Sequence, residues 1–193
     1  MNFFKSYKTY TDEKLMRLIQ QNDVDAFDEL HKRYSKRLLH FMFKMLGNNE
    51  ERAQDLLQDL FLKIVERPHL FDTTKKFYTW VFAVAANMCR TEYRNSNRKM
   101  IGMETIEKSE PVAHEDLVET VDAVQFTTEL DAALNSLSFE EKETFVLRFQ
   151  QDFGLQEIAV MMNCPEGTVK SRIYYTTRKL AAELHVFKSL LKQ

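Results

Sequence analysis

Glycine and proline are scarce in this sequence, with 4 glycines and 3 prolines among 193 residues. Sheet proteins use such residues in their many turns, whereas the abundant leucine, methionine, glutamate, lysine and glutamine favour helices. Hydrophobic residues still make up 44% of the chain, which is enough to build real cores. We therefore predict an all-α protein of one or two domains.

Long apolar runs are missing as well. No segment reaches the roughly 20 apolar residues that are needed to span a bilayer. The polar amino terminus also lacks the apolar core of a signal peptide. The sequence therefore predicts a cytoplasmic protein that does not insert into a membrane.

Cysteine and histidine form no recognisable chemical site. Cys89 and Cys164 lie far apart without a CxxC partner, and the five histidines are scattered along the chain. We interpret both cysteines as structural thiols rather than as a disulfide or metal ligands. No motif marks a nucleophile, so the sequence predicts no catalytic residue, no metal and no cofactor.

A helix-turn-helix pattern runs from Gln156 to Lys179. A short apolar helix is broken at Asn163-Cys164-Pro165, and Val169 and Ile173 of a second helix can pack onto it. Pro165 suits the first turn of that second helix. In such motifs the start of the second helix enters the major groove; here it holds Gly167, Thr168, Lys170, Ser171 and Arg172. The alternative is an ordinary helical hairpin with a solvated basic face.

Charge is segregated along the chain although the net charge is only −2. Six basic residues and one acid lie between Lys75 and Lys99, whereas seven acids and one base lie between Glu104 and Asp122. Helical periodicity also fails over residues 100–125. We predict a flexible acidic linker there, which separates helical units at 1–99 and 126–193.

The apolar spacing of the first unit predicts four helices. The first begins at Thr11, the second runs from Asp25 to Leu46, the third runs from Asn49 to Arg67, and the fourth begins at about Phe77. The second of these helices has a basic outer face made of Lys32, Arg33, Lys36 and Arg37. We interpret that face as solvated.

The third predicted helix carries an acidic, amide-rich face opposite its core stripe. This face holds Asp55, Gln58, Asp59 and an exposed Leu62. It resembles a docking surface for a basic protein partner, although single exposed leucines are also normal. Asp55 and Asp59 could instead hold Mg²⁺ in a nucleic-acid enzyme, but no third ligand or phosphate loop accompanies them.

The fourth predicted helix and the loop before it form a candidate surface for unpaired DNA. We assign Phe77 and Trp80 to the core. The opposite side combines small residues with arginines and suits a phosphate backbone. It is made of Thr79, Ala83, Ala86, Asn87, Arg90, Arg94 and Arg98. Upstream aromatic residues could stack unpaired bases.

The second unit begins near Phe126 and contains a capping box. Ser138 and Glu141 have the spacing at which each side chain accepts a hydrogen bond from the backbone N–H of the other. The helix that starts there is expected to direct Phe145, Val146 and Phe149 inward.

Four parts of the chain, taken in order, resemble sigma factors of the extracytoplasmic-function group, the smallest bacterial initiation factors. They are Ala26 to Leu38, Ala53 to Ile64, Phe77 to Arg94, and Leu134 to Phe149 together with Glu157 to Ile173. The resemblance implies sigma region 2 at 1–99 and sigma region 4 at 126–193, joined by the linker at 100–125.

The resemblance also implies partners for each surface. The face formed by Asp55, Gln58, Asp59 and Leu62 would bind core RNA polymerase, and an anti-sigma factor would cover the polymerase and DNA surfaces. Single-stranded −10 DNA would contact Phe71, Asp72, Thr73, Thr74, Lys75, Lys76, Tyr78, Asn87, Arg90, Arg94 and Arg98. Duplex −35 DNA would contact Gly167, Thr168, Lys170, Ser171, Arg172, Tyr175, Arg178 and Lys179.

Three departures from the family pattern lie in the second unit. Ser138 replaces a proline that is usual before the helix at Glu140, and the capping box accommodates this change. Tyr175-Thr176-Thr177 stands where the family often has Arg-Ala-Arg, so phosphate contacts there fall on Arg178 and Lys179, and Gly154 replaces a more usual serine. An alternative function is that of a helix-turn-helix regulator that binds duplex DNA without polymerase.

Overall fold

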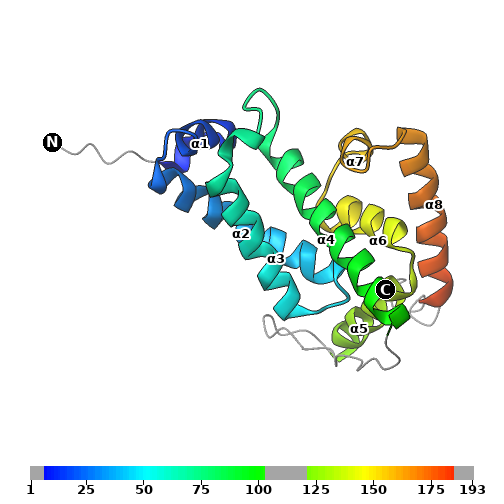
Figure 1. Cartoon of the computed structure of the whole chain (residues 1–193). Helices are drawn as coiled ribbons and strands as arrows, with labels where there is room; N and C mark the ends of the chain where they lie inside the picture. Colours follow the sequence, from blue (N-terminus) through cyan, green and yellow to red (C-terminus); the bar gives the residue numbers. More distant parts are fainter. Residues whose placement is uncertain (1–6, 103–120, 185–193) are drawn as a thin grey trace.

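The structure, a computed structural model, describes residues 7–102 and 121–184, with side chains at 7–96 and 126–184. Its first half contains the 3-10 helix η1 (Tyr7–Thr9), α1 (Asp12–Ile19), α2 (Val24–Met45), α3 (Glu50–Glu66), the 3-10 helix η2 (Pro68–Leu70) and α4 (Phe77–Gly102). Its second half contains α5 (Val121–Ser136), α6 (Phe139–Phe145), the π-helix η3 (Val146–Gln150), α7 (Leu155–Met161) and α8 (Glu166–Glu183). The described residues include no strand, which agrees with the predicted all-α class (Figure 1).

The helix boundaries of the first half follow from local capping. The side chains of Thr11, Asp23 and Asn49 each accept a hydrogen bond from a backbone N–H of the first turn that follows. Gly47 lies beyond α2 with φ 71°, a left-handed conformation that side chains disfavour. The four predicted helices of this half are therefore confirmed to within a few residues.

The second half is also organised by its caps. Ser138 Oγ accepts from the Glu141 N–H at 3.3 Å, and the Glu141 carboxylate accepts from the Ser138 N–H at 3.1 Å, which confirms the capping box. Gly154 has no side chain to contribute, so only half of such a box forms before α7: its N–H donates to Glu157. Pro165 precedes α8 instead of lying inside its first turn, because that helix begins at Glu166.

One sequence-based expectation for the core is wrong. Val146 and Leu147 are buried, but Phe149 is 50% exposed. These residues belong to the π-helix η3, whose wider turn shifts the phase of the buried face relative to an α-helix. Phe149 therefore points to solvent, although α-helical spacing predicted an inward position.

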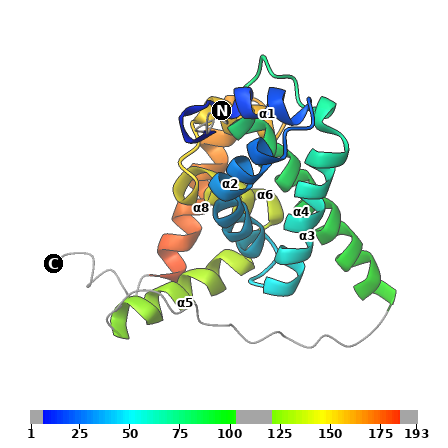
Figure 2. The ribbon, with the colours of Figure 1, turned by 90° about the vertical axis from the view of Figure 1, so that its left-hand side faces the viewer.

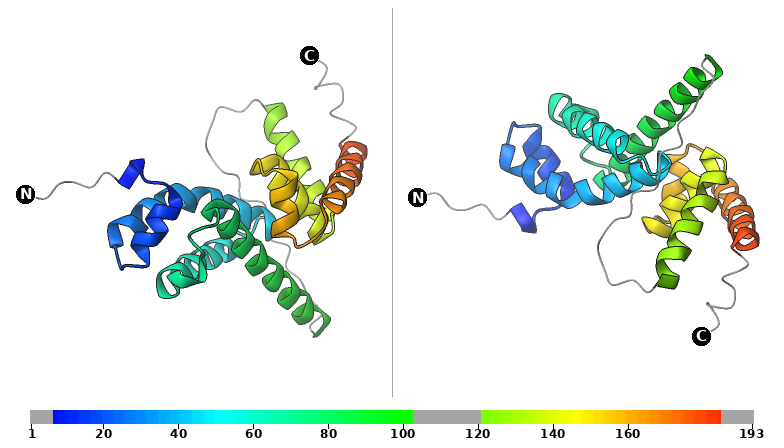
Figure 3. Two further views of the ribbon diagram at one scale, coloured as in Figure 1. Left: turned by 90° about the horizontal axis from the view of Figure 1, so that it is seen from above. Right: turned by 90° about the horizontal axis from the view of Figure 1, so that it is seen from below.

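Helical structure extends into both ends of the predicted linker. Residues 100–102 belong to α4, whose end projects beyond the bundle (Figure 3). Residues 121–125 belong to α5, which crosses below the bundle in Figure 2. The central part of the predicted linker, 103–120, lies outside the described residues.

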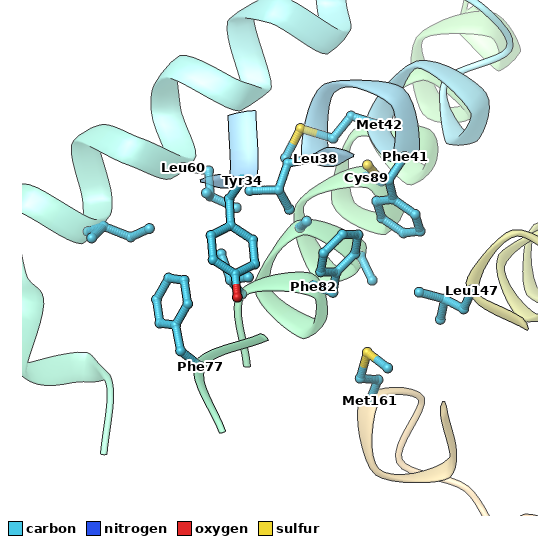
Figure 4. Packing of buried hydrophobic residues seen from close by; sticks show 14 of the residues in the cluster. Tyr34, Leu38, Phe41, Met42, Leu60, Phe77, Phe82, Cys89, Leu147 and Met161 are labelled. Carbon is cyan, nitrogen blue, oxygen red and sulfur yellow. The ribbon is translucent and has the colours of Figure 1, made fainter. Parts of the chain in front are cut away.

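A continuous hydrophobic cluster joins the two halves. α2 contributes Leu38 and Phe41, α4 contributes Phe82, and η3 and α7 contribute Leu147 and Met161, all buried. Figure 4 shows Leu147 and Met161 facing Phe82 across the boundary between the halves. A second, smaller cluster lies within the second half and contains Ala133, Leu134 and Leu180. The two halves are thus packed together in this structure.

Candidate nucleic-acid and protein interfaces

The acidic face predicted on α3 lies on the outside of the first half. Leu60 and Ile64 point into the core, while Asp55, Gln58 and Asp59 are exposed. Leu62 is 54% exposed, and one turn further on Val65 is 49% exposed. Sequence reasoning overlooked Val65, which enlarges the apolar part of this face.

The loop before α4 is held by its own polar groups. The Asp72 carboxylate accepts from the Thr74 N–H at 3.0 Å and from the Thr74 hydroxyl at 2.7 Å, and these bonds lower the pKa of Asp72. Thr73 is half-buried, whereas Lys75 and Lys76 are exposed. The loop therefore presents two cations beside the start of α4.

Phe71 was predicted to contact DNA, but its position in the structure does not allow this. Its side chain is only 2% exposed. Its ring packs edge-on against Phe77 at a centroid distance of 5.4 Å and lies 5.2 Å from Trp80. Phe71 therefore belongs to the core, as predicted for its two neighbours, because an aromatic ring fully covered by other rings cannot reach DNA.

The polar side of α4 is only partly open to solvent. Asn87 and Arg94 are exposed, whereas Arg90 is half-buried and donates to the Asn87 side chain at 2.6 Å. Arg98 has no described side chain. Arg90 also donates to both carboxylate oxygens of Glu143 on α6, at 2.8 and 2.9 Å.

Glu143 is a buried carboxylate at the boundary between the halves. Its side chain has no exposed surface, and burial raises its pKa, an effect that the neighbouring Arg90 guanidinium opposes. A buried charge without such a partner would be strongly unfavourable. Arg90 and Glu143 therefore hold α4 and α6 together.

The basic face of α2 is exposed at Lys32, Lys36 and Arg37, as predicted, whereas Arg33 is half-buried, which corrects the prediction for that residue. Arg33 bonds to Glu29 and Asp12 and to backbone carbonyls near the amino terminus. Arg37 donates to the Tyr78 hydroxyl at 2.6 Å and to the Gln151 carbonyl at 3.1 Å. The basic face gave no indication in the sequence of these distant partners.

Tyr78, a predicted DNA contact, faces the second half of the chain. Its ring is stacked on that of Phe153 at 4.2 Å and 12° between planes, and its hydroxyl donates to the Gln151 carbonyl at 2.6 Å. Burial raises the pKa of Tyr78. Phe153 itself is fully buried, and no pattern in the sequence indicated that it would lie beside Tyr78.

The helix-turn-helix is present as predicted, with α7 and α8 packed through Ile158 and Val169. Its candidate DNA residues differ in exposure. Gly167, Lys170, Ser171, Tyr175, Arg178 and Lys179 are exposed, and Thr168 and Arg172 are half-buried.

Several cations of α8 have partners on the protein. Lys170 pairs with Glu166 at 2.8 Å, and Lys179 pairs with Glu141 at 2.5 Å. Arg178 donates to the Tyr174 hydroxyl at 2.9 Å. Such exposed pairs are weak and can exchange for phosphate.

Cys89 is a buried free thiol whose pKa burial raises to about 12, and Cys164 is a half-buried free thiol. Within residues 7–96 and 126–184, whose side chains the structure describes, His, Cys, Asp and Glu form no group of three or more that could hold a metal ion. Within residues 7–102 and 121–184, no helix combines the length and apolar character needed to cross a membrane.

Comparison with known families finds two matches. The model of Sigma-70 region 2 matches residues 30–99, and that of Sigma-70 region 4 matches residues 127–180. The chain is 24% identical over 180 residues to the ECF RNA polymerase sigma factor SigW of Bacillus subtilis, covering 89% of this chain and 96% of SigW. It is 27% identical over 172 residues to the ECF RNA polymerase sigma-E factor of Haemophilus influenzae, covering 85% of this chain and 90% of that relative.

Two solved structures share the fold. The sigma factor RpoE in complex with the anti-sigma factor NepR from Bartonella quintana superposes with a TM-score of 0.72 at 22% identity, covering 83% of this chain and 97% of RpoE. CnrH in complex with the cytosolic domain of CnrY gives a TM-score of 0.68 at 20% identity, covering 91% of this chain and 97% of CnrH. These identities are too low to transfer anything beyond the fold.

Proposed function

Because the chain belongs to the extracytoplasmic-function group of sigma factors, which direct promoter-specific initiation by RNA polymerase, we propose a role for each of its exposed surfaces. The outer face of α3 binds core polymerase. The loop at 72–76 and the polar side of α4 bind the melted −10 strand, and the start of α8 reads the −35 element in duplex DNA. The chain supplies recognition and no bond-making step.

The observation that carries this proposal is the exposed face of α3. Asp55, Gln58 and Asp59 surround Leu62 and Val65, both about half exposed. A partner with basic residues around an apolar depression would cover both apolar side chains while satisfying the carboxylates. An acidic face of this kind repels phosphate, so it suits a protein partner and not DNA.

The two DNA surfaces suit different forms of DNA. Lys75 and Lys76 are exposed cations that immediately precede Tyr78 in the sequence, and Arg94 is a further exposed cation along α4. Cations and aromatic rings together bind single strands through phosphates and stacked bases. α8 instead presents Lys170 and Ser171 near its amino terminus, where a recognition helix meets base edges and phosphates in the major groove.

An inhibitory partner and a cellular location are part of the same proposal. Two relatives by fold are named as complexes with an anti-sigma factor or with a cytosolic domain. We therefore include an anti-sigma factor that covers the polymerase and DNA surfaces of this chain. Its site of action is the cytoplasm, where polymerase and promoter DNA are found.

Charge reversal on α3 tests the proposal. Asp59→Lys should abolish binding to core polymerase and promoter-specific initiation, because it opposes a basic partner, while leaving affinity for duplex DNA intact. Asp28→Lys, which reverses an exposed acid on α2, is the matched control and should leave both properties unchanged. Polymerase binding and the 5′ ends of the RNA products are measured. If Asp59→Lys initiates transcription as the wild type does, the assignment of this face is wrong.

A further inference from the structure

The segment between η3 and α7 covers the part of α4 that we assign to the melted strand. Phe153 lies flat on the Tyr78 ring, at 4.2 Å and 12°, and also packs edge-on against Phe82 at 5.1 Å. The segment comes from the second half of the chain, about 70 residues away from Tyr78 along the sequence. A distant part of the same protein therefore occupies the stacking face of Tyr78.

The polar groups next to this stack are also satisfied by the same segment. The Gln151 carbonyl oxygen accepts hydrogen bonds from the Tyr78 hydroxyl at 2.6 Å and from the Arg37 guanidinium at 3.1 Å. Arg37 lies 4.8 Å from the centre of the Tyr78 ring. An unpaired pyrimidine or guanine has the same two features: a flat ring that could stack against Tyr78 and a carbonyl oxygen that could accept a hydrogen bond from Arg37.

A third contact, between Arg90 and Glu143, resembles the contact that an arginine makes with a DNA phosphate. The Glu143 carboxylate accepts both hydrogen bonds from Arg90, one of the cations we assign to the strand. Both bonds come from Nη2 of Arg90, and a phosphate oxygen can accept a charge-assisted hydrogen bond from the same nitrogen. Ring, carbonyl and anion are thus all supplied by the second half of the protein.

The segment is held in this place at an energetic cost. Asp152 adopts φ 59°, a left-handed conformation that is unfavourable for a residue with a side chain. The Gln151 side-chain oxygen is buried and has no hydrogen-bond partner among the described residues. Solvent could reach the Gln151 oxygen if the segment left α4, which would remove the cost of leaving it unbonded.

We propose that Tyr78 and Arg37 form a binding site for an unpaired nucleobase, and that residues 151–153 occupy this site in the free protein as an internal substitute for DNA. Phe153 replaces the base on Tyr78, the Gln151 carbonyl replaces the base oxygen on Arg37, and Glu143 replaces a phosphate on Arg90. The inference rests on the proposed −10 role of α4 and adds Arg37 to it. It follows that the free protein binds single-stranded DNA weakly until the second half of the chain moves away from α4.

Binding of single-stranded DNA to the free, full-length chain tests the inference. The probe is a fluorescently labelled single strand of about 12 nucleotides and random sequence, with the duplex of the same length for comparison. Phe153→Ala should raise affinity for the single strand by about tenfold, the amount expected for freeing one stacking site. Adding Tyr78→Ala to this variant should remove the gain, because the uncovered ring is then absent.

Matched variants separate the contributions. Phe149→Ala removes an exposed ring from the same region and should change nothing. Phe153→Leu keeps an apolar side chain but cannot stack flat, so it should raise affinity in the same direction if Phe153→Ala impairs folding. In the Phe153→Ala background, Arg37→Gln should weaken binding more than Lys36→Gln, which removes the same charge at an exposed neighbour. Fluorescence of the single tryptophan, Trp80, reports whether the first half stays folded.

Transcription assays with the wild-type protein distinguish a failure of this inference from a failure of the proposed function. If wild-type protein directs initiation with core polymerase but neither Phe153 variant binds the single strand more tightly, the internal substitute is wrong and the sigma role stands. If wild-type protein gives no promoter-specific initiation, the proposed function itself fails. If Phe153→Ala raised the affinity for the single strand equally with and without Tyr78→Ala, Phe153 would not act through the Tyr78 ring. That result would also overturn the inference.

Discussion

Buried charges are concentrated where the two halves meet. Lys44 on α2 pairs with Asp131 on α5 at 2.5 Å, and both side chains are largely covered. Lys142 lies nearby, 94% covered, and its ammonium group donates to Asn135 at 2.6 Å. Burial lowers the pKa of Lys142 to about 8, and the positive charge of Lys44 adds to the effect while Asp131 opposes it.

Lys142→Met should stabilise the protein at pH 7, because it removes a charge whose burial is unfavourable. A shift from 10.5 to about 8 corresponds to about 3 kcal/mol at most. Between these two values the unfolded chain holds a proton that the folded chain has released, so wild-type stability rises with pH. The advantage of the methionine variant should therefore shrink by about 2 kcal/mol between pH 8 and pH 9.5.

Chemical denaturation at several pH values measures this difference in the free energy of unfolding. Lys36→Met, at an exposed site on α2, is the control and should show no pH-dependent difference from the wild type. An advantage of Lys142→Met that stays constant from pH 7 to pH 9.5 would mean that Lys142 is not destabilised by burial.

At the scale of elements, α8 carries cations that differ in their availability for DNA. Lys179 is linked to Glu141 in the capping box of α6, so it helps to join two helices as well as to offer charge. Arg178 contacts only Tyr174 among the interactions described, on the exposed side of the helix. We expect Arg178 to exchange its partner for a phosphate most readily.

Arg178→Ala should reduce the dependence of promoter binding on salt. Each lost phosphate contact lowers the slope of log affinity against log salt concentration by about 0.9. The measurement uses the complex of this chain with core polymerase on duplex DNA that contains the upstream promoter element. Arg17→Ala removes an exposed cation from α1 and should leave the slope unchanged. Identical slopes for the two variants would exclude Arg178 from the phosphate contacts.

Most elements could be predicted from the sequence because their determinants are local. Thr11, Asp23 and Ser138 cap helices through residues at most three positions away, and apolar spacing identified the buried faces of α2 and α3. The π-helix η3 was not predicted, since nothing in its five residues distinguishes a wide turn from an α-helical one. For this reason Phe149 was wrongly expected to point into the core.

The site was predicted less completely than the fold, because its missing parts depend on distant contacts. Phe71 was expected on the surface, but two rings from the start of α4 cover it. Arg37 is exposed as predicted, but its hydrogen bond to a carbonyl 114 residues away was not expected. No local pattern contains these partners. The exposed positions on α3 followed from helical periodicity alone.

At the scale of the whole molecule, the two halves share one hydrophobic cluster and a set of polar contacts. Phe82 meets Leu147 and Met161, and Arg90 meets Glu143. In this closed arrangement the acidic face of α3 remains exposed, whereas Tyr78 is covered by Phe153. We therefore propose that polymerase binds first and that separation of the halves then uncovers the proposed single-strand site.

Energy transfer between the halves tests this order most directly. Dyes are attached at Thr91→Cys on α4 and Glu140→Cys on α6, two exposed positions next to the Arg90–Glu143 pair. The background carries Cys164→Ser, and the buried Cys89 does not compete for label. Our account predicts high transfer in the free chain and low transfer after core polymerase is added. High transfer that persists in a polymerase complex active on its promoter would contradict it.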